Sequence, residues 1–117
     1  GPGSPSVLTN MLTSIEQHVN WIADCLGYLR HHSIGQIEPA LEFENSWVEH
    51  GNDLASKTLR HECTSWYLGA NVPGKPRVFM PYVGGFPLYK KKCDQVVREG
   101  YEGFQLTPSS HFRCLPV

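Results

Sequence analysis

Residues 7–32 read VLTNMLTSIEQHVNWIADCLGYLRHH, and this stretch holds the strongest periodic signal in the chain. Its aliphatic side chains recur at alternating steps of four and three residues, at Leu8, Leu12, Ile15, Val19, Ile22, Leu26 and Leu29. Such spacing lines one face of an amphipathic helix. Pro5 and Ser6 supply a start signal and Gly35 a stop, so the sequence predicts a helix over residues 7–32. Because Trp21 and Cys25 widen the stripe, we expect this helix to be covered on more than one side.

The rest of the chain predicts two further helices and several short extended segments. A helix from Pro39 to about Leu59 is indicated because proline suits a first helical turn, and because acidic residues fill the first half. A third helix fits residues 87–99, which Gly100 follows. Residues 66–68, 78–82 and 104–106 have the character of short irregular strands between turns rich in glycine and proline. The predicted fold class is therefore α+β.

Length and composition restrict the class of protein. The 117 residues suffice for one domain, and 11 glycines with 9 prolines argue against a simple helical bundle. The net charge of −1 argues against nucleic acid or an anionic membrane as a partner. The apolar runs are far shorter than the roughly 20 residues that cross a bilayer. With 4 cysteines and no CxxC pair, we expect a soluble, cytoplasmic protein without a disulfide framework or a metal site.

Two glycine-containing motifs have more than one interpretation. Residues 69–76, GANVPGKP, approach the phosphate-binding loop GxxxxGK[ST], but Pro76 stands where that motif needs a hydroxyl, so a loop with several turns is favoured. Residues 1–6, GPGSPS, lead into the long predicted helix, whose positive end can receive a carbonyl or phosphate group. GPGS is also left behind by a common protease site, so from these letters alone both origins stay open.

The segment SWYLGANVPGKPRVFMPYVGGF, residues 65–86, combines aromatic residues, a run of turn residues and an apolar extended stretch. This order is typical of a mobile loop tied to a rigid strand, the arrangement of ligand lids. An irregular but static surface segment is the alternative.

Four blocks of the sequence, taken in order, resemble a known family. GPGSPSVLTNM, SIEQHVNWI, SWYLGANVPGKPRVFMPYVGGFPLY and CDQVVREGYEGF are similar to the carboxy-terminal part of Baeyer-Villiger monooxygenases, in the phenylacetone and steroid monooxygenase branch. The resemblance covers residues 1–106 and implies a flavoprotein with two Rossmann-like dinucleotide-binding domains. Such enzymes use FAD, NADPH and dioxygen to insert oxygen beside a ketone, which gives an ester or lactone. The two GxGxxG motifs of the family do not occur in this chain.

The resemblance also implies roles for particular residues. It assigns Gly1, Pro2, Gly3 and Ser4 to a turn beside the flavin, with Met11 close behind it and Trp66 on a control loop over NADP. It assigns substrate-pocket positions to Ser6, Val7, Leu8, Thr9 and Met80. The catalytic arginine of the family has no counterpart here, so no catalytic residue and no metal ligand is expected in this chain.

On this interpretation the chain is a single carboxy-terminal segment. It divides into the flavin-side turn and long helix (1–35), a second helix (36–60), the control-loop region (61–87), a helix and short strand (88–106) and a tail (107–117). Its partners are the FAD and NADP domains of a parent chain, and the segment alone is expected to be inactive and to self-associate. The alternative is a stand-alone binding or partner protein, which an upstream reading frame without GxGxxG motifs would favour.

Overall fold

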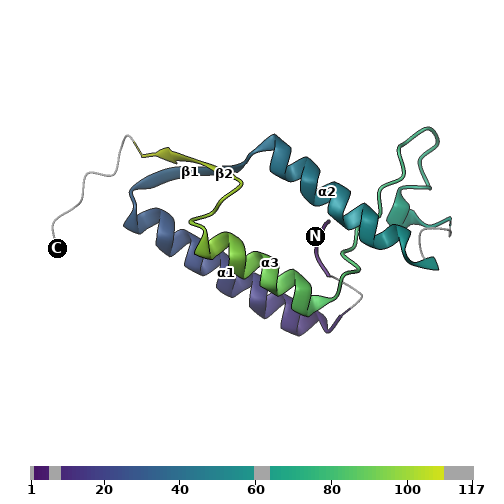
Figure 1. Cartoon of the computed structure of the whole chain (residues 1–117), viewed down its shortest axis with the longest axis horizontal. Coiled ribbons are helices and arrows are strands. Elements are labelled where there is room, and N and C mark those ends of the chain that lie inside the picture. Colours follow the sequence, from purple (N-terminus) through teal and green to yellow (C-terminus); the bar gives the residue numbers. More distant parts are fainter. Residues whose placement is uncertain (1, 6–8, 60–63, 110–117) are drawn as a thin grey trace.

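The computed structural model describes residues 2–5, 9–59 and 64–109. Its elements follow along the chain as α1 (Met11–His31), β1 (Ile34–Pro39), α2 (Leu41–Ser56), the 3-10 turn η2 (Trp66–Leu68), α3 (Phe86–Arg98) and β2 (Phe104–Pro108). Helices α1 and α3 lie side by side, the two strands lie near one end of this pair, and α2 runs away from the strands (Figure 1). The predicted α+β class, with one long helix and two shorter ones, is confirmed.

Helix α1 begins at Met11, later than the predicted start at residue 7. The cause is Asn10, whose side-chain oxygen accepts a hydrogen bond from the amide of Leu12 at 3.0 Å. Such an N-cap satisfies an amide that has no partner within the helix. The helix ends at His31, and the predicted stop signal, Gly35, instead lies inside β1.

The aliphatic stripe of α1 faces away from the rest of the described chain. Five of its side chains are more than half exposed, namely Leu12 (78%), Ile15 (52%), Val19 (57%), Ile22 (53%) and Leu26 (60%). Leu29, near the end of the helix, is partly buried, and Leu8 lies outside the described residues. The packed face carries Ser14 and Cys25, and lies about 110° away around the helix at 3.6 residues per turn. The described residues therefore do not supply the cover expected for this stripe, because they pack on the flank that carries Cys25.

The beginning of the predicted second helix forms a strand instead. β1 pairs antiparallel with β2, so that Pro39 lies opposite Phe104. The amide of Ala40 donates to the carbonyl of Gly103 at 2.8 Å, and α2 then begins at Leu41. Proline lacks an amide donor and fits the first turn of a helix or an edge strand equally well. The partner strand, far away in the sequence, decides between them.

The predicted strand at residues 66–68 is also wrong, because this segment is the 3-10 turn η2. The hydroxyl of Ser65 accepts from the amide of Tyr67 at 3.3 Å and starts the turn. Gly69 ends it at φ 70, in the left-handed region that glycine adopts without strain. Residues 78–82 are extended but join no sheet in the described part of the chain. The predictions for α3 and β2 are confirmed to within two residues.

In the described part of the chain, buried side chains lie in separate small clusters rather than in one core. Ala55, Leu68 and Phe79 connect the end of α2 to η2 and the extended segment. At the other end, Tyr101 is 1% exposed and lies against the rings of Trp21 and Tyr28. Burial there raises the pKa of the Tyr101 hydroxyl to about 12.

The chain exposes more surface than a folded monomer of its mass. Its accessible surface is 8617 Å², against about 6,400 Å² expected from the mass of 13.2 kDa. Its radius of gyration is 17.2 Å, against about 13 Å for a compact domain of this length. The fold is therefore elongated, and much of its apolar surface is left without cover.

Candidate functional site

Two segments that are far apart in the sequence pair through their backbones. The amide of Gly3 donates to the carbonyl of Met80 at 2.6 Å, and the amide of Tyr82 donates to the carbonyl of Ser4 at 2.9 Å. Ser4 and Pro5 are buried against this segment. The pairing brings together three of the residues singled out from the sequence, Gly3, Ser4 and Met80.

The amino-terminal turn fits only because residue 3 is glycine. Gly3 has φ +75, and a Cβ atom added there would stand 2.7 Å from Nε1 of Trp47. A side chain at this position would therefore meet both backbone strain and a steric clash. Pro2, by contrast, is exposed and Gly3 is partly exposed, so the outer side of the turn stays open.

The same extended segment also bonds the turn that carries Trp66. The amide of Met80 donates to the carbonyl of Tyr67 at 3.0 Å. The Tyr67 ring stacks on the Trp66 indole with centroids 4.0 Å apart and also lies 6.3 Å from the Phe79 ring. Trp66 itself is 63% exposed. The indole therefore lies at the surface and stacks on Tyr67, whose carbonyl is hydrogen-bonded to Met80.

The loop between these anchors is exposed along its length. Residues 71–78 are all exposed, whereas Leu68 and Phe79 at its two ends are buried. Internal turns close it, with amide-to-carbonyl bonds from Val72 to Gly69 at 3.1 Å and from Lys75 to Val72 at 3.3 Å. An exposed loop between fixed ends has the arrangement of a ligand lid.

An aromatic cluster that sequence reasoning missed lies beneath the amino-terminal turn. The Trp47 indole stacks on the Tyr82 ring with centroids 5.2 Å apart and planes 3° apart. Tyr89 of α3 contacts both of these rings, and His18 of α1 packs edge-on against Tyr89. Nε2 of His50 lies 3.0 Å from the Tyr82 hydroxyl. The cluster joins α2 to the pair formed by α1 and α3, and the spacing of Trp47 and His50 on one helix face was its only signal in the sequence.

The environment of the cluster keeps its polar groups neutral. Burial, helped by the nearby charge of Lys92, lowers the pKa of His50 below its ordinary value. Burial also raises the pKa of the Tyr82 hydroxyl. At neutral pH the tyrosine hydroxyl therefore faces an uncharged imidazole, and the two groups share a hydrogen bond.

Comparison with known proteins gives relatives over almost the whole chain. The chain is 41% identical over 107 residues to the acetone monooxygenase (methyl acetate-forming) of Gordonia sp. strain TY-5, which covers 91% of this chain and 20% of that protein. It is 37% identical over 101 residues to a Baeyer-Villiger monooxygenase of Pseudooceanicola batsensis, covering 86% of this chain and 18% of the relative. No protein-family model matches.

Solved structures agree with the curated relatives. Oxidized steroid monooxygenase bound to NADP superposes with a TM-score of 0.84 at 43% identity, over 93% of this chain and 20% of that one. The chain is a homologue of one segment of the Baeyer-Villiger monooxygenases. It spans about one fifth of the relatives that it matches. A further matched structure, at 29% identity and a TM-score of 0.81, is that of OTEMO in complex with FAD and NADP.

The residues that the Baeyer-Villiger resemblance assigns fall into three groups. Gly3, Ser4 and Met80 meet through backbone hydrogen bonds, and Trp66 connects to them through Tyr67. The helix-side positions stay apart from this backbone pairing: Thr9 is partly buried just before α1, and Met11, 52% exposed, stands in its first turn. Gly1, Ser6, Val7 and Leu8 lie outside the described residues.

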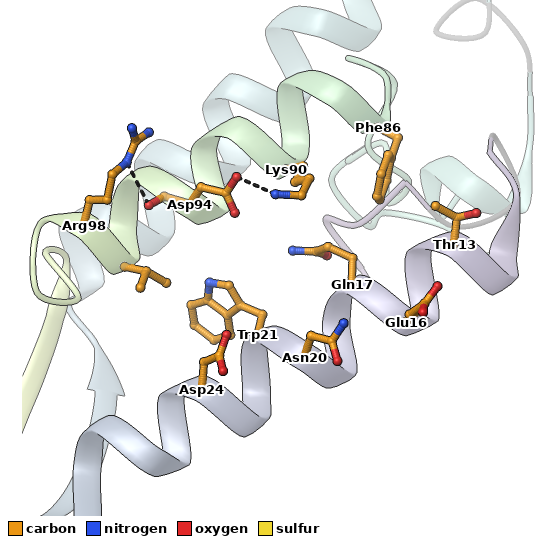
Figure 2. Close-up of a pocket in the computed structure, with 11 residues that line it drawn as sticks. Thr13, Glu16, Gln17, Asn20, Trp21, Asp24, Phe86, Lys90, Asp94 and Arg98 are labelled. Carbon is orange, nitrogen blue, oxygen red and sulfur yellow. Dashed lines mark hydrogen bonds and ion pairs between the residues drawn. The ribbon is translucent and has the colours of Figure 1, made fainter. Parts of the chain in front are cut away.

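A separate groove of about 650 Å³ runs between α1 and α3 (Figure 2). Trp21 forms part of its lining and donates from Nε1 to the carbonyl of Cys93 at 3.2 Å. Lys90 forms an ion pair with Asp94 at 2.6 Å across one turn of α3. Its lining holds three acidic and two basic side chains, namely Glu16, Asp24, Asp94, Lys90 and Arg98, so the groove carries no strong charge of one sign.

The described residues hold neither a cluster of metal-ligating side chains nor a helix that could span a membrane. No three side chains of His, Cys, Asp or Glu gather there as a group that could hold a metal ion. None of the helices in the same residues has the length and apolar character that a membrane span requires.

Proposed function

We propose that this chain is the part of an FAD- and NADPH-dependent Baeyer-Villiger monooxygenase that supplies the flavin-side turn, part of the ketone pocket and the NADP lid. The reaction converts a ketone, dioxygen, NADPH and a proton into an ester or lactone, water and NADP⁺. The bound FAD and NADPH supply the electrons and activate dioxygen. The residues of this chain position and enclose the reactants, and none of them is proposed to transfer a proton.

The observation that carries this proposal is the backbone pairing at Met80. Its carbonyl accepts from Gly3, on the turn assigned to the flavin, and its amide donates to Tyr67, which stacks on the lid residue Trp66. One extended segment therefore joins three positions for which the resemblance implies contact with flavin, ketone and NADP. The open outer side of the turn, with exposed Pro2, is compatible with a flat ring lying against it.

The full-length protein that contains this segment tests the proposal. We expect its reading frame to carry two GxGxxG motifs, and the purified protein to oxidise NADPH faster when a ketone such as acetone, cyclohexanone or phenylacetone is added. A full-length protein without bound flavin and without ketone-dependent NADPH oxidation would overturn the proposal.

The segment on its own is expected to hold neither cofactor. A helix terminus contributes only about 0.3 to 1 kcal/mol of favourable electrostatics, whereas micromolar affinity needs roughly 8 kcal/mol. We therefore predict that the chain, incubated with FAD and then desalted, shows no flavin absorbance, and that it does not oxidise NADPH. A yellow protein with about one flavin per chain would contradict this prediction.

The exposed stripe of α1 predicts self-association when the segment is made alone. Burying side chains of this size is worth about 1.5 to 3 kcal/mol each, and five of them are more than half exposed. We expect a dimer or larger assembly by light scattering, which Ile22→Lys should shift toward monomer. Asn20→Lys adds the same charge to an exposed polar position of α1 and should leave the assembly intact. A monomeric wild-type chain at high concentration would contradict the prediction.

A stand-alone partner protein remains the second candidate, and the same exposed stripe favours it. In that case the stripe would bind a separate chain. The full-length reading frame separates the two candidates, because a short frame without GxGxxG motifs fits only this second one.

A further inference from the structure

Two aromatic residues reach the amino-terminal turn from different directions. Tyr82, which is 1% exposed, donates its amide to the carbonyl of Ser4 at 2.9 Å. Trp47, on α2, places Nε1 where a Cβ atom on Gly3 would be 2.7 Å away. The two rings lie on each other with planes only 3° apart. One residue of the stack, Tyr82, therefore bonds the turn through its backbone, and the ring of the other, Trp47, lies against Gly3.

Other contacts keep the stack itself in place. His50, one turn after Trp47 on α2, lies with Nε2 3.0 Å from the Tyr82 hydroxyl. Asn52, also on α2, accepts through its side-chain oxygen from the amide of Phe79 at 3.2 Å. Helix α2 thus holds the extended segment at a backbone amide and at a ring hydroxyl. A rotation or shift of α2 would carry the indole toward or away from Gly3.

A role as simple core filler explains these contacts less well. A filling side chain can be replaced by others of similar volume, because apolar packing has little directional requirement. Here a flat ring fits between the Tyr82 ring and a glycine that has no side chain, and the indole edge with Nε1 and Cδ1 is the part that faces Gly3. Shape, rather than apolar volume alone, is what the position requires.

We propose that Trp47 and Tyr82 are positioning residues, which fix the amino-terminal turn at the place where it borders the flavin. The proposal rests on the proposed function for the assignment of that turn to the flavin, and on the structure alone for the fixing of the turn. Neither residue is proposed to touch a reacting atom.

The test uses the full-length holoenzyme with Trp47→Leu, Trp47→Phe and a control, Trp21→Leu. Trp21 is likewise half-buried in ring contacts, with Tyr101 and Phe104, at the opposite end of the fold. Deuterium uptake is measured in the peptide that contains residues 2–5, together with the flavin circular dichroism spectrum and the fraction of consumed NADPH that yields oxygenated ketone. Exchange reports local opening, so Trp47→Leu should raise the exchange rate of the turn by about tenfold or more.

Trp47→Phe keeps a flat ring on Tyr82 but lacks the indole edge that faces Gly3. We expect Trp47→Phe to fold normally and to raise the exchange rate of the turn by a smaller factor than Trp47→Leu. The positioning role can therefore be tested even if Trp47→Leu does not fold. Both variants should lower the fraction of NADPH that yields product and alter the flavin spectrum. Trp21→Leu should change none of these three signals.

The remaining outcomes contradict the positioning role, the assignment of the turn to the flavin, or the proposed function. Unchanged uptake in the turn of both Trp47 variants, or an equal rise in Trp21→Leu, overturns the positioning role. A loosened turn with an unchanged flavin spectrum and unchanged product yield keeps the positioning role but overturns the assignment of this turn to the flavin. Absence of flavin from the wild-type protein overturns the proposed function and leaves the uptake result interpretable on its own.

Discussion

Trp66→Ala in the full-length enzyme is expected to weaken NADP binding by about tenfold or more, to lower ketone oxidation and to leave the flavin content normal. Loss of the indole removes one N–H donor and a flat contact face, and about 1.4 kcal/mol corresponds to that tenfold change. The fold should tolerate the change, because Trp66 is 63% exposed and has its one ring stack on Tyr67. Titration with NADP measures the change in affinity, and the melting temperature shows whether the fold is retained.

Trp66→Phe serves as the matched variant for this experiment. It keeps a ring to stack on Tyr67 and loses the N–H donor, so we expect NADP affinity between those of wild type and Trp66→Ala. A buried core tryptophan would instead cost about 3 to 5 kcal/mol of stability when truncated to alanine. The lid assignment is wrong if Trp66→Ala keeps wild-type NADP affinity, or if its main defect is a large fall in melting temperature with loss of flavin.

Gly3→Ala in the same enzyme is expected to reduce the flavin bound per chain and to raise the KM for the ketone. The left-handed backbone at φ +75 costs a non-glycine residue about 1 to 2 kcal/mol. The added Cβ would also stand 2.7 Å from Nε1 of Trp47, and the stack on Tyr82 prevents the indole from turning aside. The turn must then move away from its bonds to Met80 and Tyr82. Flavin absorbance relative to protein measures the effect.

Gly74→Ala separates backbone strain from the clash with Trp47. Gly74 has nearly the same backbone, at φ +77, but an added Cβ would meet nothing within 4 Å. It lies on the exposed loop rather than at the turn, so we expect its flavin content to equal that of wild type. Equal flavin content in Gly3→Ala and Gly74→Ala would show that the turn does not set the flavin site.

The helices could be predicted from the sequence, but their ends only in part. The periodic spacing of Ile15, Val19 and Ile22 predicts α1 correctly, because a repeat near 3.6 is a local property. The start at Met11 depended on the cap by Asn10, which competed with the earlier signals of Pro5 and Ser6. Strand β1 was missed because its stability comes from pairing with β2, and local patterns do not report a partner so distant in the sequence.

The sequence likewise named some residues of the candidate site but not the contacts between them. The resemblance named Gly3, Ser4 and Met80, but only the structure shows that backbone hydrogen bonds join them. Trp47 and Tyr82 carried no motif, and their stack depends on how α2 crosses the extended segment. Sequence periodicity also predicted cover for the apolar stripe of α1. The described residues do not provide that cover, because their contacts with α1 lie on the flank with Cys25.

The most direct test of the proposed function is the fate of molecular oxygen in the full-length protein. The protein is incubated with NADPH, ¹⁸O₂ and one of the ketones acetone, cyclohexanone and phenylacetone. The product is analysed by mass spectrometry. We predict an ester or lactone that carries one ¹⁸O atom, formed in step with NADPH oxidation. If NADPH is oxidised without any ¹⁸O-labelled ester or lactone from any of these ketones, or if the protein holds no flavin, the account is contradicted.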